Sequence, residues 1–200
     1  MNLPNKITMT RIVISILILI ILLFPWYQVG FNFPEFVIKG RIIVDLKYII
    51  CGVLFVIASL SDFFDGYYAR KYKLVTDFGK VMDAIADKIL VNGLLIILAC
   101  NGFISVIVPV IVITRDTFTD AIKAASSKKG KVIGASFAGK TKTMVMMIGI
   151  TLVMFYNLPF ELISSSIRVD EAVVLVATLL SVISGIQYYL NCKDYLFTEK

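Results

Sequence analysis

The 200-residue chain contains no histidine. This absence excludes catalytic triads and general bases that depend on an imidazole, and it excludes zinc or haem sites that need a histidine ligand. The three cysteines, Cys51, Cys100 and Cys192, stand alone in or beside apolar stretches. Isolated thiols of this kind form neither a disulfide framework nor a C-x-x-C metal site. The remaining metal ligands are oxygen atoms, which favour Mg²⁺, Mn²⁺ or Ca²⁺.

Charged residues are also scarce, at 17% of the chain, whereas 58% of the residues are hydrophobic and the mean hydropathy is +0.88. Soluble domains are usually about 45–50% apolar, so this composition indicates an integral membrane protein. Apolar runs recur at intervals along the whole chain. They are Ile12–Tyr27, Ile42–Leu60, Ile89–Cys100, Ile104–Ile113, Met144–Tyr156 and Ala172–Tyr189.

Only the first, second and last of these runs approach the ~20 residues that a helix needs to span a bilayer. The other three reach that length if polar neighbours are counted, namely Gly79–Lys88, Thr114–Ala125 and Gly139–Thr143. Polar residues at membrane depth normally face the interior of a helix bundle. We therefore predict an all-α membrane protein, one domain over residues 1–200, with six transmembrane helices whose polar ends line a shared cavity. A short interfacial helix over Asn2–Thr8 is expected before the first span.

The positive charges are distributed unevenly over the ends of the six predicted helices. Four lie on one side, Lys39, Arg41, Lys47 and Arg168, and the other sixteen of the twenty lie on the side that holds both termini. Cytoplasmic loops are enriched in lysine and arginine, so the asymmetry predicts a multi-pass protein of the cytoplasmic membrane with both termini in the cytoplasm. Nucleic-acid binding is disfavoured, because the basic residues alternate with spans instead of forming one stripe.

Two pairs of aspartates are the strongest candidates for chemistry. Asp62 and Asp65 are three residues apart, and Asp83 and Asp87 are four apart. On helices, both spacings place the two side chains on one face. Four carboxylates that converge at a membrane boundary repel one another, and a divalent metal is the simplest source of balancing charge. The pattern therefore predicts a metal site at the cytoplasmic side.

The segment from Asp62 to Asp87 matches the spacing D-x2-D-G-x2-A-R-x8-G-x3-D-x3-D at every fixed position. This pattern resembles the signature of the CDP-alcohol phosphotransferases. The resemblance implies a six-helix membrane enzyme that holds two divalent ions, Mg²⁺ or Mn²⁺, on the diphosphate of a CDP-linked donor. It implies that Asp62, Asp65, Asp83 and Asp87 are the metal ligands, and that Asp87 is also the base that deprotonates the attacking hydroxyl.

The same resemblance assigns a CDP-binding pocket to Asp62 and to the residues between the two acid pairs. These are Gly66, Ala69, Arg70 and Gly79. Glycine and alanine let a ribose or a base approach the backbone closely, and arginine can bind phosphate with two parallel hydrogen bonds.

A second polar group interrupts the fourth predicted span and opens the fifth. Arg115, Lys140 and Lys142 together would hold a phosphate on the acceptor alcohol, since a neutral acceptor would not need three cations. The chain most resembles the bacterial family members that transfer a phosphatidyl group from CDP-diacylglycerol to sn-glycerol 3-phosphate. The alternatives are that Arg115 is only a structural partner of Asp116 or Asp120, and that the two lysines only set the topology.

Four motifs carry this closer resemblance. They are L-P-N-K-I-T-x-x-R at Leu3–Arg11, A-S-L-S-D-F-F-D-G at Ala58–Gly66, A-D-K at Ala86–Lys88 and G-K-x-K-T at Gly139–Thr143. The chain departs from the family pattern at Ala84, where proline is expected, and at Asp116, where glutamate is expected. Within the first motif, Asn5, Thr8 and Arg11 are candidates to reach the nucleotide or headgroup cavity.

Three other interpretations stay open on the sequence. One is a member of the same family with another phosphorylated acceptor, such as inositol phosphate. Another is a membrane prenyltransferase, which also binds diphosphate through aspartates and Mg²⁺ but usually carries two Asp-rich motifs far apart. The last is a divalent-cation transporter, which would place acids near the bilayer midplane and on both sides. The resemblance favours a homodimeric enzyme that acts among membrane lipids, without a nucleic-acid partner.

Overall fold

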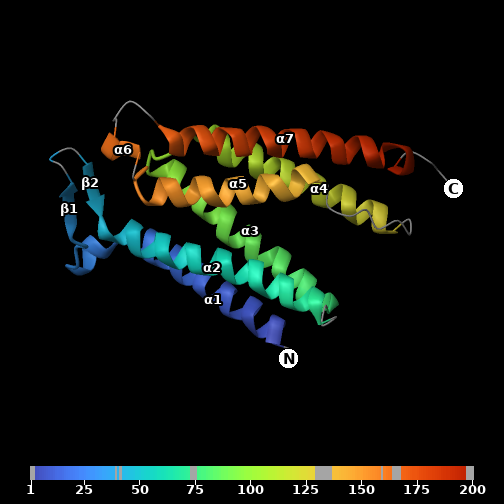
Figure 1. Ribbon diagram of the computed structural model, residues 1–200, viewed down its shortest axis with the longest axis horizontal. Helices are drawn as coiled ribbons and strands as arrows, with labels where there is room; N and C mark the ends of the chain where they lie inside the picture. Colours follow the sequence, from blue (N-terminus) through green and yellow to red (C-terminus); the bar gives the residue numbers. More distant parts are fainter. Residues whose placement is uncertain are drawn as a thin grey trace.

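The structure is a computed structural model, and it describes residues 3–38, 40, 42–72, 76–128, 137–158, 160–163 and 168–196. Over these residues the protein is a bundle of six long helices with a small sheet at one end (Figure 1). The long helices are α1 (Leu3–Leu23), α2 (Leu46–Lys71), α3 (Asp77–Cys100), α4 (Ile107–Lys128), α5 (Phe137–Met154) and α7 (Val169–Leu196). The short elements are the 3-10 helix η1 (Trp26–Val29), the strands β1 (Glu35–Ile38) and β2 (Ile42–Asp45), and the one-turn helix α6 (Phe160–Ile163).

The three predicted helices whose apolar runs are too short do extend into their polar neighbours. α3 contains Gly79–Lys88, α4 contains Thr114–Ala125 and α5 contains Gly139–Thr143, so this part of the prediction is confirmed. Within the described ranges, three helices are long and apolar enough by themselves to cross a membrane. They are Asn5–Leu23, Leu46–Tyr68 and Val169–Lys193.

One expectation for the first quarter of the chain needs correction. α1 runs without a break from Leu3 to Leu23, so the residues up to Thr8 do not form a separate interfacial helix, and Asn2 lies outside the described residues. The all-helical architecture is as predicted, and the structure adds one small hairpin, in which β2 pairs antiparallel with β1 and places Asp45 opposite Glu35. The start of the second apolar run is rich in β-branched residues, which favour a strand as well as a buried helix.

The helices form two groups of three. α1 packs on both α2 and α3, whereas α7 packs on both α4 and α5, and contacts of α3 with α4 and of α2 with α5 join the groups. Phe55, Leu94 and Met146 are fully buried where these groups meet, yet Val13 and Leu179 are 64% and 63% exposed on the outside. Large exposed apolar side chains around a core that also holds buried charge are typical of a protein solvated by lipid.

The first and last helices end on the same side of the molecule. The start of α1 and the end of α7 occupy the end of the bundle opposite the β1–β2 hairpin (Figure 1). The last turns of α2, the first turns of α3 and the polar half of α4 lie at this same end. The two acid pairs and the predicted acceptor residues are therefore carried by helix segments at one end of the molecule.

Candidate active site

Four aspartates converge on one arginine. Asp62 and Asp65 come from α2, Asp83 and Asp87 from α3, and Arg11 from α1, the helix that packs on both. Nη1 of Arg11 donates to Oδ1 of Asp62 and, at 3.0 Å, to Oδ1 of Asp87. Nη2 of Arg11 donates to Oδ1 of Asp83 and, at 3.1 Å, to Oδ2 of Asp65. The structure thus brings together the four acids that the spacing predicts.

Among the side chains that the structure describes, the charges in this cluster do not balance. One guanidinium faces four carboxylates, which leaves three formal negative charges when all four are ionised. Arg11 is 1% exposed and Asp65 is 4% exposed. The side chains of Asp62, Asp83 and Asp87 are 27%, 45% and 33% exposed. A cation from outside the protein can therefore approach these three carboxylates.

The donor atoms of the cluster suit a hard divalent cation. One carboxylate oxygen each from Asp62, Asp65 and Asp83 lie within 4.8 Å of one another. All donors are carboxylate oxygens, which Mg²⁺, Mn²⁺ and Ca²⁺ prefer, whereas zinc sites normally include nitrogen or sulfur ligands. Thr8 lies one turn before Arg11 and donates its hydroxyl to Oδ2 of Asp65 at 3.3 Å, so α1 also helps to orient this carboxylate. The residues present thus fit a divalent metal.

The start of α3 packs tightly against the start of α1. A Cβ at Gly79 would lie 2.7 Å from Oδ1 of Asn5 and 3.0 Å from Oγ1 of Thr76, so only glycine leaves room for this approach. Thr76 caps α3, because its hydroxyl oxygen accepts from the N–H of Gly79 at 3.0 Å and its O–H donates to Oδ1 of Asn5 at 3.2 Å. Gly79 therefore has a packing role as well as its predicted role at the nucleotide, and Gly66 directly follows Asp65 in α2.

Three predicted site residues lie outside what the structure describes at the level of side chains. They are Ala69 and Arg70 in α2 and Lys140 in α5, for which only the helical backbone is described. Their assignments to the CDP pocket and to the acceptor phosphate stay predictions.

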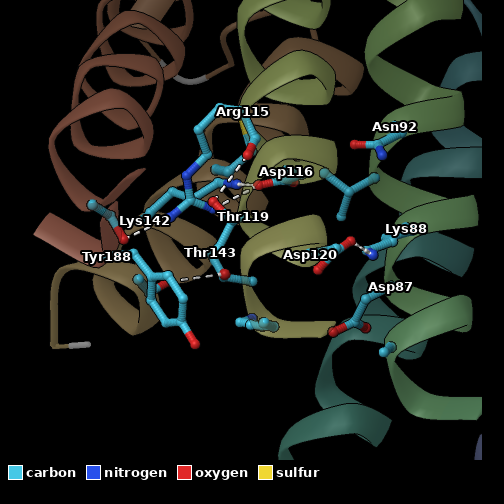
Figure 2. A pocket seen from close by; sticks show the side chains of 16 residues that line it. Asp87, Lys88, Asn92, Arg115, Asp116, Thr119, Asp120, Lys142, Thr143 and Tyr188 are labelled. Atoms are coloured by element: carbon cyan, nitrogen blue, oxygen red, sulfur yellow. Dashed lines mark hydrogen bonds and ion pairs between the residues drawn. The ribbon is translucent and has the colours of Figure 1, made fainter. Parts of the chain in front are cut away.

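A cavity of about 270 Å³ lies beside the aspartate cluster, between α3, α4, α5 and α7 (Figure 2). Asp87 lines it from α3, Arg115 from α4 and Lys142 from α5. In Figure 2, Arg115 and Lys142 gather around Asp116 on one side, and Asp87 lies on the other. One carboxylate of the acid cluster and two of the predicted acceptor cations therefore line the same space.

Asp116 connects the two cations. Nη1 of Arg115 and Nζ of Lys142 both donate to Oδ1 of Asp116, each at 2.6 Å. Nη2 of Arg115 donates to Oγ of Ser184 on α7 at 2.7 Å. Arg115 is thus a structural partner of Asp116, as one alternative proposes. Each of its two Nη atoms carries two N–H groups, and the bonds to Asp116 and Ser184 use one from each. The guanidinium therefore retains donor capacity that a phosphate can use.

The sequence indicates Arg11 only as a neighbour of the cavity, whereas the structure places it at the centre of the acids. One sequence feature could have predicted the contact of Arg11 with the acids. Arg11 lies inside an apolar helix, and a cation there needs an acidic partner. The sequence names Asp116 only as an alternative partner of Arg115 and as a departure from the family pattern, and it assigns no role to Ser184. Serine is common in apolar helices, so nothing in the sequence separates Ser184 from Ser181, the other serine of α7.

Comparisons with known proteins agree with these observations. The family profile described as CDP-alcohol phosphatidyltransferase matches residues 1–183. A CDP-diacylglycerol–glycerol-3-phosphate 3-phosphatidyltransferase of Bacillus subtilis is 36% identical over 198 residues, which cover 99% of this chain and 98% of that protein. The protein of the same name from Rickettsia bellii is 31% identical over 194 residues, 97% of each chain. That from Mycoplasma genitalium is 41% identical over 112 residues, 56% of this chain and 48% of its own.

Proposed function

Because this chain belongs to the CDP-alcohol phosphatidyltransferase family, we propose that it transfers the phosphatidyl group of CDP-diacylglycerol to sn-glycerol 3-phosphate. The products are phosphatidylglycerophosphate and CMP. The names of the relatives from Bacillus subtilis and Rickettsia bellii describe this reaction, and both align with nearly the whole chain. The observation that carries the proposal is the cavity that Asp87 shares with Arg115 and Lys142. A phosphorylated alcohol needs a proton acceptor near its hydroxyl and cations near its phosphate, and this cavity offers both.

In the proposed reaction, the acceptor hydroxyl oxygen forms a bond to the phosphorus of the phosphatidyl group. The bond between that phosphorus and the CMP oxygen breaks, and CMP leaves with its electron pair. The hydroxyl proton passes to the carboxylate of Asp87, which acts as the general base. Arg115 and Lys142, with Lys140 as a third cation, bind the acceptor phosphate and so direct the hydroxyl towards Asp87.

Asp62, Asp65, Asp83 and Asp87 would hold the divalent cations, Mg²⁺ or Mn²⁺, with two ions per site as the family resemblance implies. When bound, these ions supply positive charge for diphosphate binding and for the departure of CMP. The oxygen-only donor set and the excess of negative charge support this assignment. The nucleotide is assigned to residues of α2 and α3 next to the acids. They are Asp62, Gly66, Ala69, Arg70 and Gly79.

All six long helices are proposed to cross the cytoplasmic membrane, with both termini and the cavity on the cytoplasmic side. The shared end of α1 and α7, and the sixteen basic residues predicted for that side, support this orientation. The homodimer stays a prediction from the family resemblance. Another phosphorylated acceptor, such as inositol phosphate, is the alternative function, because it would also use the cations of the cavity. The prenyltransferase and transporter interpretations gain no support from the family match.

The test is CMP release by the purified protein with CDP-diacylglycerol and Mg²⁺. Glycerol 3-phosphate, inositol phosphate, serine and buffer without acceptor are compared. Release with glycerol 3-phosphate alone is expected. Release with a different acceptor would keep the family chemistry and refute the acceptor assignment, whereas no release with any acceptor would refute the proposed reaction.

A further inference from the structure

The side chain of Arg115 lies across the surface of α7, at a place where that helix has no side chain. A Cβ at Gly185 would lie 2.9 Å from Cγ and 3.2 Å from Nε of Arg115, so the arginine approaches closer than any other residue type at position 185 would allow. The neighbouring Ser184 accepts a hydrogen bond from Nη2 of Arg115 at 2.7 Å. Together, the bare backbone at Gly185 and the hydroxyl of Ser184 form a seat for the guanidinium on α7.

We propose that Ser184 and Gly185 are positioning residues that set the affinity of the enzyme for the phosphate of its acceptor. This role rests on the proposed function, in which Arg115 binds that phosphate. Neither residue needs to touch the acceptor, because each acts by fixing the side chain of Arg115.

Arg115 cannot easily move to make room for a side chain at position 185. Its backbone lies in α4, where its carbonyl oxygen accepts from the hydroxyl of Thr119 at 2.9 Å. Its far end is bonded to Asp116 and Ser184. The atom that a new Cβ would meet first is Cγ, close to the root of the side chain, so a rotation of the guanidinium alone does not relieve the contact. The stem must shift away from α7, which lengthens the bond to Ser184.

Fixing this side chain matters for binding because arginine is long and flexible. A guanidinium that is already held in the binding geometry loses less conformational freedom when a phosphate arrives. Ser184 and Arg115 both line the cavity that Asp87 reaches, so the seat orients the cation within the space where the acceptor is proposed to bind. A displaced guanidinium would weaken acceptor binding and leave the aspartate cluster and the CDP donor unaffected.

The test compares steady-state kinetics of S184A, S184T and G185A with the control S181A. Ser181 lies one turn earlier on α7 and is fully buried, and the described residues offer its hydroxyl no hydrogen-bond partner, so S181A removes the same atom without removing a bond to Arg115. S184A is expected to raise the KM for glycerol 3-phosphate about tenfold, the scale of one lost hydrogen bond to a charged group. G185A should raise this KM at least as much. The KM of S184T should stay near the wild-type value, because threonine keeps the hydroxyl.

The KM for CDP-diacylglycerol and the kcat at saturating acceptor should change less than about twofold in all four variants, a difference well under 1 kcal/mol. Stabilisation of the folded protein by glycerol 3-phosphate, measured by thermal unfolding in detergent, should weaken in S184A and G185A but not in S181A. An unchanged acceptor KM in S184A, or an equal rise in S181A, would overturn the positioning role. If the wild-type protein releases no CMP with glycerol 3-phosphate, the proposed function fails first, and the positioning role fails with it.

Discussion

Replacing Arg11 by glutamine removes a cation that contacts all four aspartates. The buried guanidinium contacts every acid of the cluster, at 3.0 Å for Asp87 and 3.1 Å for Asp65 and more closely for Asp62 and Asp83. Removing one partner of a buried ion pair costs about 3–5 kcal/mol, because the other charge is left without compensation. Three of the four acids are partly exposed, so we expect about 3 kcal/mol, the lower end of that range.

The stability that R11Q loses should depend on whether a divalent metal is present. For a chain of this size, about 3 kcal/mol corresponds to a fall of roughly 6–12 °C in the unfolding midpoint. We expect this fall for R11Q in EDTA. Millimolar Mg²⁺ should reverse most of it, because the bound cation supplies the charge that Arg11 no longer provides. The wild-type protein should gain less from Mg²⁺ than R11Q, since Arg11 already neutralises part of the cluster.

The assay is thermal unfolding in detergent at one fixed scan rate, with EDTA or Mg²⁺, for wild type, R11Q, R11K and S15A. Ser15 is buried one turn after Arg11 on α1 and donates its hydroxyl to the carbonyl oxygen of Arg11, so S15A perturbs the same helix without removing charge. S15A should lose the same stability in both buffers, and R11K should fall between wild type and R11Q. An equal loss for R11Q with and without Mg²⁺ would refute the idea that Arg11 and metal neutralise the same acids.

Three further predictions concern the proposed reaction. D62N, D83N and D87N should each abolish CMP release while the detergent-solubilised protein keeps its helical circular-dichroism spectrum, and substantial turnover in any of them would contradict the metal site. R115A should raise the KM for glycerol 3-phosphate by about 10²-fold, the scale of a lost charge-assisted contact, and leave that for CDP-diacylglycerol nearly constant. D116N should raise the acceptor KM by about tenfold, because Arg115 loses its charged partner, and a KM that stays at the wild-type value would argue against this anchoring role.

Much of the bundle follows from the sequence because polar segments with helical spacing continue the apolar runs. The segment Gly79–Lys88 is helical for this reason, and its acid pair faces the pair on α2 as the spacing predicts. The strand Ile42–Asp45 is different, because a short run of β-branched residues suits a strand and a helix equally well. The central place of Arg11 and the contact of Ser184 with Arg115 depend on how each helix is rotated about its own axis. Packing decides this rotation, and no local pattern encodes it.

The spacing of Asp83 and Asp87 on α3 fixes the distance between two acids that face different surroundings. Both carboxylates contact Arg11, but of the two only Asp87 also lines the cavity beside it. The four-residue step advances about 6 Å along the helix axis, so in the proposed reaction one turn of α3 separates an acid that only holds metal from an acid that also faces the acceptor. One residue inserted between the two acids would rotate Asp87 by about 100° about the helix axis, away from both Arg11 and the cavity. The length of this turn is therefore as constrained as the identity of the acids.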